Sequence, residues 1–261
     1  MEMPAPNASV LSRKAQIVER LSEVLPRDAV ISDERETRAY ECDALTAYKC
    51  PPLCAVLPAN TQEVSDVLRI CHAMSVPVVP RGSGTSLAGG ALPTADCVIL
   101  GVAKMNDVIE AKYDDRYVRV QTGRTNLSVT GAVETNGFFY APDPSSQLAC
   151  AIAGNIAMNS GGAHCLKYGV TTNNLMGVTM VLMDDRSIIA HPAQAGRRPP
   201  GPDGLCQFRS CRTGCDRHYQ GWHPARRDRI HGPPLYRSDR SLRQSRVSHV
   251  RGVVDRRSRR L

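Results

Sequence analysis

The chain has 261 residues, 42% of them hydrophobic, which is enough to bury the core of at least one domain. Its net charge of +8 would ordinarily suggest nucleic acid or an anionic membrane as a partner, but the charge is unevenly distributed. Residues 1–192 carry a net charge of −4 and all five lysines, whereas residues 193–261 carry 17 Arg, no Lys and five Asp, a net charge of +12. The basic character belongs to the last part of the chain, which argues against a nucleic-acid binder.

The ten cysteines predict buried free thiols, because several lie inside apolar stretches such as 96–100. Residues 1–10 lack the basic start and apolar run of a secretory signal. No segment has about 18 consecutive apolar residues, as a membrane-spanning helix needs. We therefore expect a cytoplasmic chain without a transmembrane segment.

The predicted elements begin with a helix over 12–25, where apolar residues recur with helical spacing until Pro26. A short strand at 29–31 and a polar, irregular stretch at 33–48 follow. The order strand, helix, strand over 53–57, 61–75 and 76–79 predicts a βαβ unit with parallel strands. Residues 1–50 are thus a helix and an extended segment that lead into a domain spanning 51–192.

Further strands are predicted at 97–102, 117–121, 178–183 and 188–190, with a helix near 126–136. This order favours an α+β fold of two sheet-bearing subdomains with a ligand between them. From residue 193 Pro-Pro and Arg-Arg pairs interrupt any periodicity, and apolar residues are scattered. Such a segment buries too little surface to offset its ordering entropy, so 193–261 is predicted to be disordered.

The most informative motif is the loop Pro80-Arg81-Gly82-Ser83-Gly84-Thr85-Ser86-Leu87-Ala88-Gly89-Gly90, which directly follows a predicted strand. Glycines let backbone N–H groups converge on an anion, the hydroxyls add donors, and Arg81 could supply charge nearby. Leu87 stands where a Rossmann fingerprint has its third glycine, and no P-loop motif occurs, so nicotinamide and ATP are not supported. Taken alone, the loop is equally consistent with a flexible surface turn.

A second stretch runs from Pro142-Asp143-Pro144-Ser145-Ser146 into a run dominated by small residues that ends at Gly161-Gly162. Small residues suit close approach of the backbone to a flat ligand. By itself, the run favours a tightly packed buried helix.

Three motifs in this order resemble one protein family: P-R-G-S-G-T-S-L-A-G-G, then P-D-P-S-S, then G-N-I-A-x-N-x-G-G with K-Y-G-V-T. Together they are similar to the FAD-binding subunit of glycolate oxidase and its relatives, the FAD-linked D-lactate and D-2-hydroxyglutarate dehydrogenases. The resemblance runs from about Leu21 to Ala190. It implies the vanillyl-alcohol-oxidase (PCMH-type) fold, with FAD held between two α+β subdomains.

The resemblance assigns cofactor-binding residues, none of them catalytic. Around the diphosphate it places Pro80, Arg81, Gly82, Ser83, Gly84, Thr85 and Ser86, with Gly89 and Gly90 supporting the turn. Beside the flavin and ribityl chain it places Pro142, Asp143, Ser145 and Ser146, and the wall continues through Gly154, Asn155, Ile156 and Ala157. Gly161, Gly162, Lys167, Tyr168 and Gly169 match positions that shape the adjoining turn.

The family oxidises small 2-hydroxy acids by hydride transfer to FAD, while protein groups orient the acid and remove the hydroxyl proton. Relatives carry those groups in a cap domain that follows an E-G-x-x-G strand, and neither is recognisable after Ala193. Ala153 and Asp185 stand where the family usually has glycine. No histidine lies near Arg81, so noncovalent FAD is expected.

The Arg-rich tail has three interpretations. It could be a nucleic-acid-binding arm, although natural arms usually mix in lysine. It could bind zinc through Cys206, Cys211, Cys215 and His218, although this spacing is not a standard zinc motif. The interpretation favoured here is an out-of-frame segment, because the resemblance stops where Arg, Pro, Ser and His become abundant.

Two functions follow. The chain is either the FAD-binding portion of a glycolate or D-lactate dehydrogenase, which could assemble with other glycolate oxidase subunits, or a non-catalytic fragment that at most binds FAD. No metal site is predicted, and the catalytic residues and the particular acid cannot be assigned from these motifs.

Overall fold

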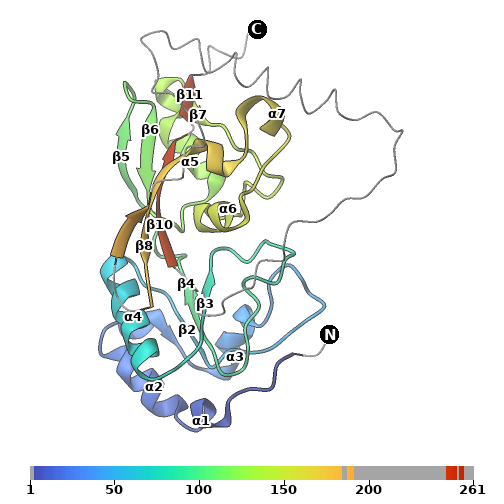
Figure 1. The fold of residues 1–261 in the computed structure, drawn as a ribbon, viewed down its shortest axis with the longest axis vertical. Coiled ribbons are helices and arrows are strands. Elements are labelled where there is room, and N and C mark those ends of the chain that lie inside the picture. Colours follow the sequence, from blue (N-terminus) through green and yellow to red (C-terminus); the bar gives the residue numbers. More distant parts are fainter. Residues whose placement is uncertain (1–2, 184–186, 191–244, 252, 256–261) are drawn as a thin grey trace, which may run out of the picture. The chain divides into compact units, whose positions relative to one another are not determined.

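The computed structural model describes residues 3–183, 187–190, 245–251 and 253–255, and these form an α+β fold with two sheet-bearing parts (Figure 1). No helix among them is long and apolar enough to cross a membrane. Asp185 and the four residues considered above as zinc ligands, Cys206, Cys211, Cys215 and His218, lie outside the described residues.

The first sheet has the order β1-β2-β4-β3, formed by β1 (Val30–Ile31), β2 (Cys54–Val56), β4 (Val98–Gly101) and β3 (Val78–Arg81). Strands β2 and β3 are each parallel to β4, which lies between them, and β1 is antiparallel to β2. Helix α4 (Thr61–Ala73) connects β2 to β3, with Asn60 capping its N-terminus. The predicted parallel crossover is confirmed, and β4 separates its two strands.

Both faces of this sheet are covered, as a parallel sheet requires. Alternate residues of β4 separate two cores: Val98 and Leu100 pack under α4 and α2 (Lys14–Ser22), whereas Ile99 packs toward Tyr40. Helix α1 (Ala8–Leu11) joins the first core, and α3 (Glu34–Thr37) precedes Tyr40 in the chain. The sheet is therefore a rigid base from which the loop after β3 leaves.

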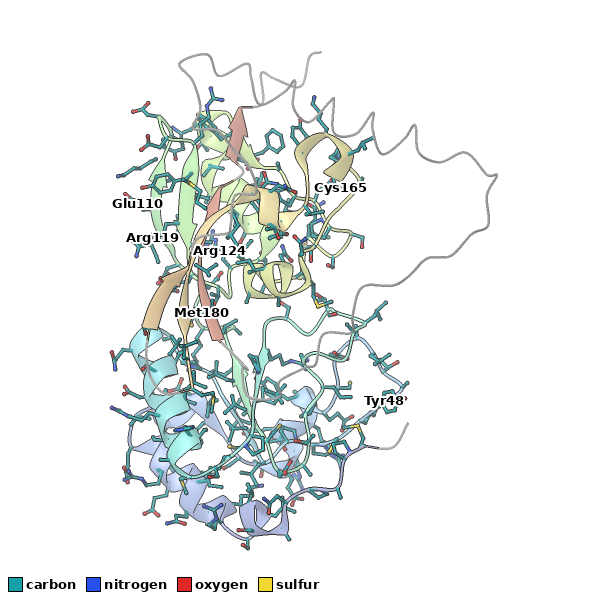
Figure 2. The ribbon with its side chains drawn as sticks, in the orientation of Figure 1. Tyr48, Glu110, Arg119, Arg124, Cys165 and Met180 are labelled. Atoms are coloured by element: carbon teal, nitrogen blue, oxygen red, sulfur yellow. The ribbon has the colours of Figure 1, made fainter. Side chains whose placement is uncertain are left out.

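The second sheet is antiparallel throughout, in the order β5-β6-β10-β8-β9. Its strands are β5 (Val108–Lys112), β6 (Tyr117–Val120), β10 (Ser245–Arg251), β8 (Leu175–Val181) and β9 (Ser187–Ala190). Helices α5 (Asn126–Val133) and α6 (Ile152–Met158) pack on it through a separate apolar core. Glu110 and Arg119 face each other in register on β5 and β6 (Figure 2).

The smaller elements complete the chain. A two-stranded pair joins β7 (Phe138–Tyr140) to β11 (Val253–Asp255), and α7 (Cys165–Tyr168) follows α6. Short 3-10 helices occupy Arg27–Ala29, Arg38–Tyr40, Glu134–Asn136 and Thr171–Asn174.

Within the segment after residue 193 that is predicted to be disordered, the structure describes two strands, β10 and β11. Strand β10 lies between β6 and β8 and pairs with both, and β11 pairs with β7. A strand in this position hydrogen-bonds along both of its edges, a source of order that hydrophobic periodicity does not reveal. The other residues of the tail, 193–244, 252 and 256–261, lie outside the described part of the chain.

Candidate functional site

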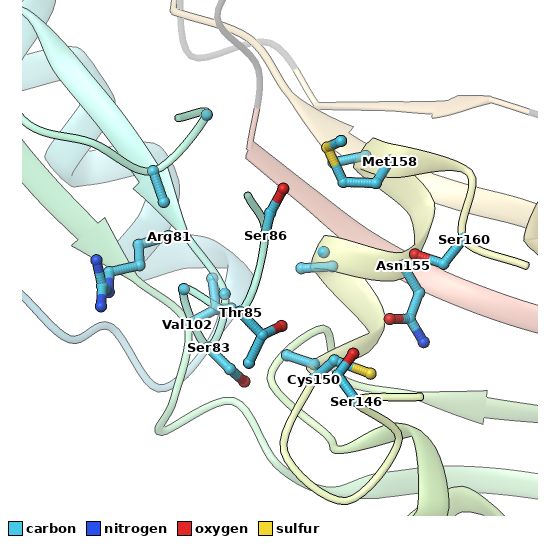
Figure 3. Close-up of a pocket in the computed structure, with 18 of the residues that line it drawn as sticks. Arg81, Ser83, Thr85, Ser86, Val102, Ser146, Cys150, Asn155, Met158 and Ser160 are labelled. Carbon is cyan, nitrogen blue, oxygen red and sulfur yellow. The ribbon is translucent and has the colours of Figure 1, made fainter. Parts of the chain in front are cut away.

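A cavity of about 380 Å³ lies between the loop that follows β3 and helix α6 (Figure 3). This volume is within the range of small-molecule sites, roughly 300–1,000 Å³. The loop side is lined by Pro80, Arg81, Gly82, Ser83, Gly84, Thr85, Ser86, Gly90 and Ala91, next to Val102. The helix side is lined by Ser146, Cys150, Ala151, Ala153, Gly154, Asn155, Ala157, Met158 and Ser160.

The loop side presents mainly backbone. Gly84 and Gly89 have φ of +69° and +70°, a left-handed conformation that costs other residues about 1–2 kcal/mol. Gly82 lies against α6, since a Cβ there would come within 3.4 Å of the Gly154 nitrogen. With no Cβ at these three positions, the amides between them are accessible to an anion.

Arg81 is among the residues that line the cavity, but its guanidinium points away from it (Figure 3). Its Nη1 donates a hydrogen bond of 2.7 Å to the carbonyl of Cys42, and its guanidinium lies 5.7 Å from the centre of the Tyr40 ring. The Arg81 charge therefore lies beside the loop, next to Gly84, and is not directed into the cavity. The hydroxyls of Ser83, Thr85 and Ser86 remain as the side-chain donors of the loop.

The helix side presents small side chains and one buried amide. Ala151, Ala153, Gly154 and Ala157 form a low wall against which a flat group can pack. Asn155 is only 1% exposed, and its Nδ2 has no hydrogen-bond partner. An unsatisfied buried donor costs about 1–3 kcal/mol, and Asn155, which is among the residues that line the cavity, carries one.

Most of the sequence-predicted site residues meet at this cavity, but Gly89, Pro142, Asp143, Ser145 and Ile156 do not line it. Asp143 faces another way, because its carboxylate accepts hydrogen bonds from the backbone N–H and ring Nδ1 of His164. A Cβ on Gly162 would lie 2.2 Å from the Asp143 carbonyl oxygen, so the turn at Gly162 packs directly on Asp143. The P-D-P-S-S motif therefore shapes the wall, while only Ser146 of it lines the cavity.

A smaller cavity of about 220 Å³ adjoins the first and shares Gly82, Ser83 and Ala151 with it. Its other lining residues are Ala103, Asn106, Gly123 and Thr125. Gly123 cannot carry a side chain, since a Cβ would lie 1.9 Å from the Val102 carbonyl oxygen. Arg124 ties this region together by donating to the Asn106 carbonyl at 2.9 Å (Figure 2).

Sequence reasoning missed this second cavity. Gly123 and Thr125, just after β6, were its only signal. A single glycine after a strand is too common in turns to indicate a site.

The two adjoining cavities fit an elongated dinucleotide such as FAD better than a compact ligand. Glycine backbone and hydroxyls suit a diphosphate, and the low wall with the unpartnered Asn155 amide suits a planar ring with acceptor atoms. In the part of the chain that is described, no group of three or more His, Cys, Asp or Glu could hold a metal ion.

Comparison with known proteins identifies the ligand class, because residues 52–189 match the FAD binding domain family. The chain belongs to this family. Its cofactor is FAD, and the α+β, PCMH-type FAD-binding fold predicted from the motifs is confirmed.

Among curated relatives, the glycolate oxidase subunit GlcD of Escherichia coli (strain K12) is 42% identical over 175 residues, covering 67% of this chain and 35% of that protein. GlcD of Bacillus subtilis (strain 168) is 44% identical over 143 residues, or 55% and 30% of the two chains. A D-lactate dehydrogenase of Anaerostipes hadrus is 30% identical over 168 residues, or 64% and 35%. The chain thus spans about a third of the length of these relatives.

Solved structures share the fold at low identity. An alkyldihydroxyacetonephosphate synthase matches with a TM-score of 0.64 at 19% identity. The match covers 76% of this chain and 37% of the synthase chain. A substrate-bound p-cresol methylhydroxylase gives 0.59 at 19% identity, with 78% and 41% covered.

Proposed function

We propose that this FAD-binding domain belongs to an oxidoreductase that oxidises a small 2-hydroxy acid, glycolate or D-lactate, by hydride transfer to FAD. The observation that carries the proposal is a cavity with a diphosphate-type loop on one side and a low wall with a buried free amide on the other. The relatives named for glycolate oxidase and D-lactate dehydrogenase support the substrate class.

In this proposal the residues of the chain bind and orient the cofactor. The amides and hydroxyls of Gly82–Ser86 hold the diphosphate, and the smaller cavity beside Gly123 and Thr125 accommodates an end of the dinucleotide. Asn155 donates its free amide to a flavin acceptor, and Ala153 and Gly154 exclude water from one ring face. Bound FAD supplies the two-electron acceptor for the acid.

Noncovalent FAD is part of this proposal, because no histidine lines the cavity among the described residues. Acid precipitation of the loaded protein should leave all flavin in the supernatant. Flavin retained on the precipitate would contradict this, and Cys150, which lines the cavity, would then be the residue to substitute.

A second candidate function is a non-catalytic FAD binder. It is favoured because, among the described residues, the cavity is lined by no Asp, Glu, His or Lys that could remove the hydroxyl proton of a substrate. The chain covers only about 35% of the length of its GlcD relative from E. coli.

One experiment separates the two functions. The full chain is purified with FAD, its flavin absorbance is recorded near 450 nm, roughly where free flavin absorbs, and glycolate or D-lactate is added without oxygen. For the 261-residue chain we expect bound flavin whose absorbance is not bleached by either acid. Bleaching by either acid would establish the enzyme, and the absence of bound flavin would overturn both candidates.

We further propose that residues 193–261 are encoded out of frame, since the family match ends at 189 and the composition changes immediately afterwards. The strands β10 and β11 are compatible with this, because the backbone of any residue except proline carries both the donor and the acceptor that sheet pairing uses. Another frame of the gene should encode an E-G-x-x-G strand and a cap domain. Early stop codons in every other frame would overturn the idea.

Three further statements remain predictions. The protein assembles with other glycolate oxidase subunits, it binds no nucleic acid, and it is located in the cytoplasm. Co-purification with such subunits from the source cells would test the first of these, and fractionation of those cells would test the last.

A further inference from the structure

We propose that Arg81 is a positioning residue for the diphosphate loop: it fixes the loop backbone from behind through the segment Tyr40–Leu45, here called the buttress. The inference rests on the proposed FAD site and adds a function for residues that do not line its cavities. The buttress lies in the polar stretch 33–48, where the sequence shows no periodicity.

On the buttress side, Arg81 makes two contacts of different kinds. Its Nη1 donates to the Cys42 carbonyl at 2.7 Å, and its guanidinium lies over the Tyr40 ring at 5.7 Å from the centre. Tyr40 in turn packs against the buried face of the first sheet, with Val79 and Ile99. The arginine therefore joins the end of β3 to a segment that is itself anchored in the core.

On the loop side, the same guanidinium lies directly behind Gly84. A Cβ at Gly84 would come within 2.5 Å of Arg81 Nη2 and 2.7 Å of its Cζ. The Gly84 carbonyl accepts a hydrogen bond of 2.9 Å from the backbone N–H of Ala44. Gly84 is thus held between Arg81 and the buttress in its left-handed conformation.

The buttress has its own internal constraint. Asp43 is 4% exposed, and its Oδ1 accepts a hydrogen bond of 2.9 Å from the backbone N–H of Leu45. The Leu45 side chain extends beneath the second positive-φ glycine, with its Cδ2 3.4 Å from where a Cβ of Gly89 would be. Both left-handed glycines of the loop are therefore supported from the buttress.

These contacts give Arg81 a different role from a phosphate-binding arginine. Its guanidinium is directed away from the cavity and is occupied by a carbonyl and a ring. Donors that are already oriented before the ligand arrives lose little entropy on binding, so fixing the amides of Gly82–Ser86 increases affinity for a diphosphate.

The test uses the full chain and four variants, Arg81→Met, Arg81→Lys, Tyr40→Ala and Tyr40→Phe. FAD affinity is measured by quenching of flavin fluorescence. We expect roughly tenfold weaker binding for Arg81→Met, because this variant loses the charged hydrogen bond to the Cys42 carbonyl. Arg81→Lys should be nearly as weak, because an ammonium lacks the planar surface that supports Gly84. Tyr40→Ala should weaken binding several-fold, and Tyr40→Phe, which keeps the ring, should bind like the parent.

Arg13→Met is the matched control, since Arg13 also donates to a backbone carbonyl, that of Met74 at 3.2 Å, and neither residue lines the cavity. It should leave FAD affinity unchanged. Parent-like affinity in Arg81→Lys would show that Arg81 acts through its charge and would overturn the proposal. If Arg81→Met does not fold, parent-like affinity in Tyr40→Ala overturns it equally.

A second measurement needs no flavin and separates this inference from the proposed function. Amide hydrogen exchange of the FAD-free chain should become faster at 82–86 and 42–45 in Arg81→Met, with no change there in Arg13→Met. Unchanged exchange would overturn the positioning role whether or not FAD binds. Faster exchange in a chain that binds no FAD would keep the positioning role and reject the FAD site.

Discussion

The loop Gly82–Ser86 and helix α6 face the same cavity, but they present different parts of the chain to it. The loop offers backbone amides in an unusual conformation, with Gly84 at φ +69° and supported from behind by Arg81. Helix α6 offers small side chains in ordinary helical geometry, plus one buried amide at Asn155. The loop should therefore be sensitive to conformation, whereas the helix should be sensitive to side-chain volume and to the loss of one donor.

The largest effect is expected from Gly84→Ala. The added Cβ would meet the Arg81 guanidinium at 2.5 Å, in a conformation that already costs about 1–2 kcal/mol for alanine. FAD affinity, measured by fluorescence titration, should fall at least about tenfold. Gly131→Ala on α5 is the control, because its Cβ would meet nothing within 4 Å. Equal FAD affinity in Gly84→Ala and Gly131→Ala would show that the loop is not sensitive to backbone conformation.

Asn155→Asp tests the helix wall at its one donor. The replacement is nearly isosteric, but it converts the buried Nδ2 donor into an acceptor and adds a buried charge. Binding of FAD should weaken by roughly tenfold, as expected for one lost buried hydrogen bond. A change in affinity below twofold, in a variant that still unfolds cooperatively, would mean that Asn155 does not contact the cofactor.

Gly154→Ala should change stability and binding in opposite directions. Its Cβ would meet nothing within 4 Å, so the FAD-free chain should gain up to about 1 kcal/mol from the better helix propensity of alanine. The same methyl group would enter the cavity and weaken FAD binding a few-fold. Thermal unfolding with and without FAD measures the stability of the FAD-free chain and its affinity for FAD. An increase in both the stability and the affinity would show that the flavin does not lie against α6.

Thiol reactivity should distinguish the core behind the loop from the segment after α6. Burial raises the pKa of Cys54 and Cys71 to about 12 and that of Cys97 to about 11, whereas Cys165 on α7 is exposed (Figure 2). At about pH 8, iodoacetamide should modify Cys165 and leave the other three protonated and unreactive. Peptide mass spectrometry reads this out, and early labelling of Cys97 would show that the first sheet opens readily.

The smallest effect is expected from salt. Arg81 is the only Lys or Arg that lines the cavity among the described residues, and its guanidinium points away. FAD affinity should therefore change by less than about threefold between 0.05 and 0.5 M NaCl, since screening acts mainly on charge pairs. A steep salt dependence would show that a cation from outside the described residues reaches the diphosphate.

The sequence by itself determined the cofactor class and most of the site. Strand β3 followed by four glycines in eleven residues predicted an anion loop, and the motifs at 142–162 predicted the second wall. These features can be predicted locally, because the conformational freedom of glycine and the small size of alanine are properties of the residue itself and need no distant contact.

Only the tertiary structure decided which motif residues face the cavity. Asp143 lies in a matching motif, yet it bonds His164, and Arg81 turns toward Cys42, because side-chain direction depends on partners 21 and 39 residues away. The pairing of β10 with β6 and β8 is likewise nonlocal, since the sheet and not the periodicity of the tail orders that strand. The buttress residues could not be predicted from the sequence either, because their contacts with the loop are nonlocal. The polar stretch 33–48 supports the loop only once folding places it behind Gly84.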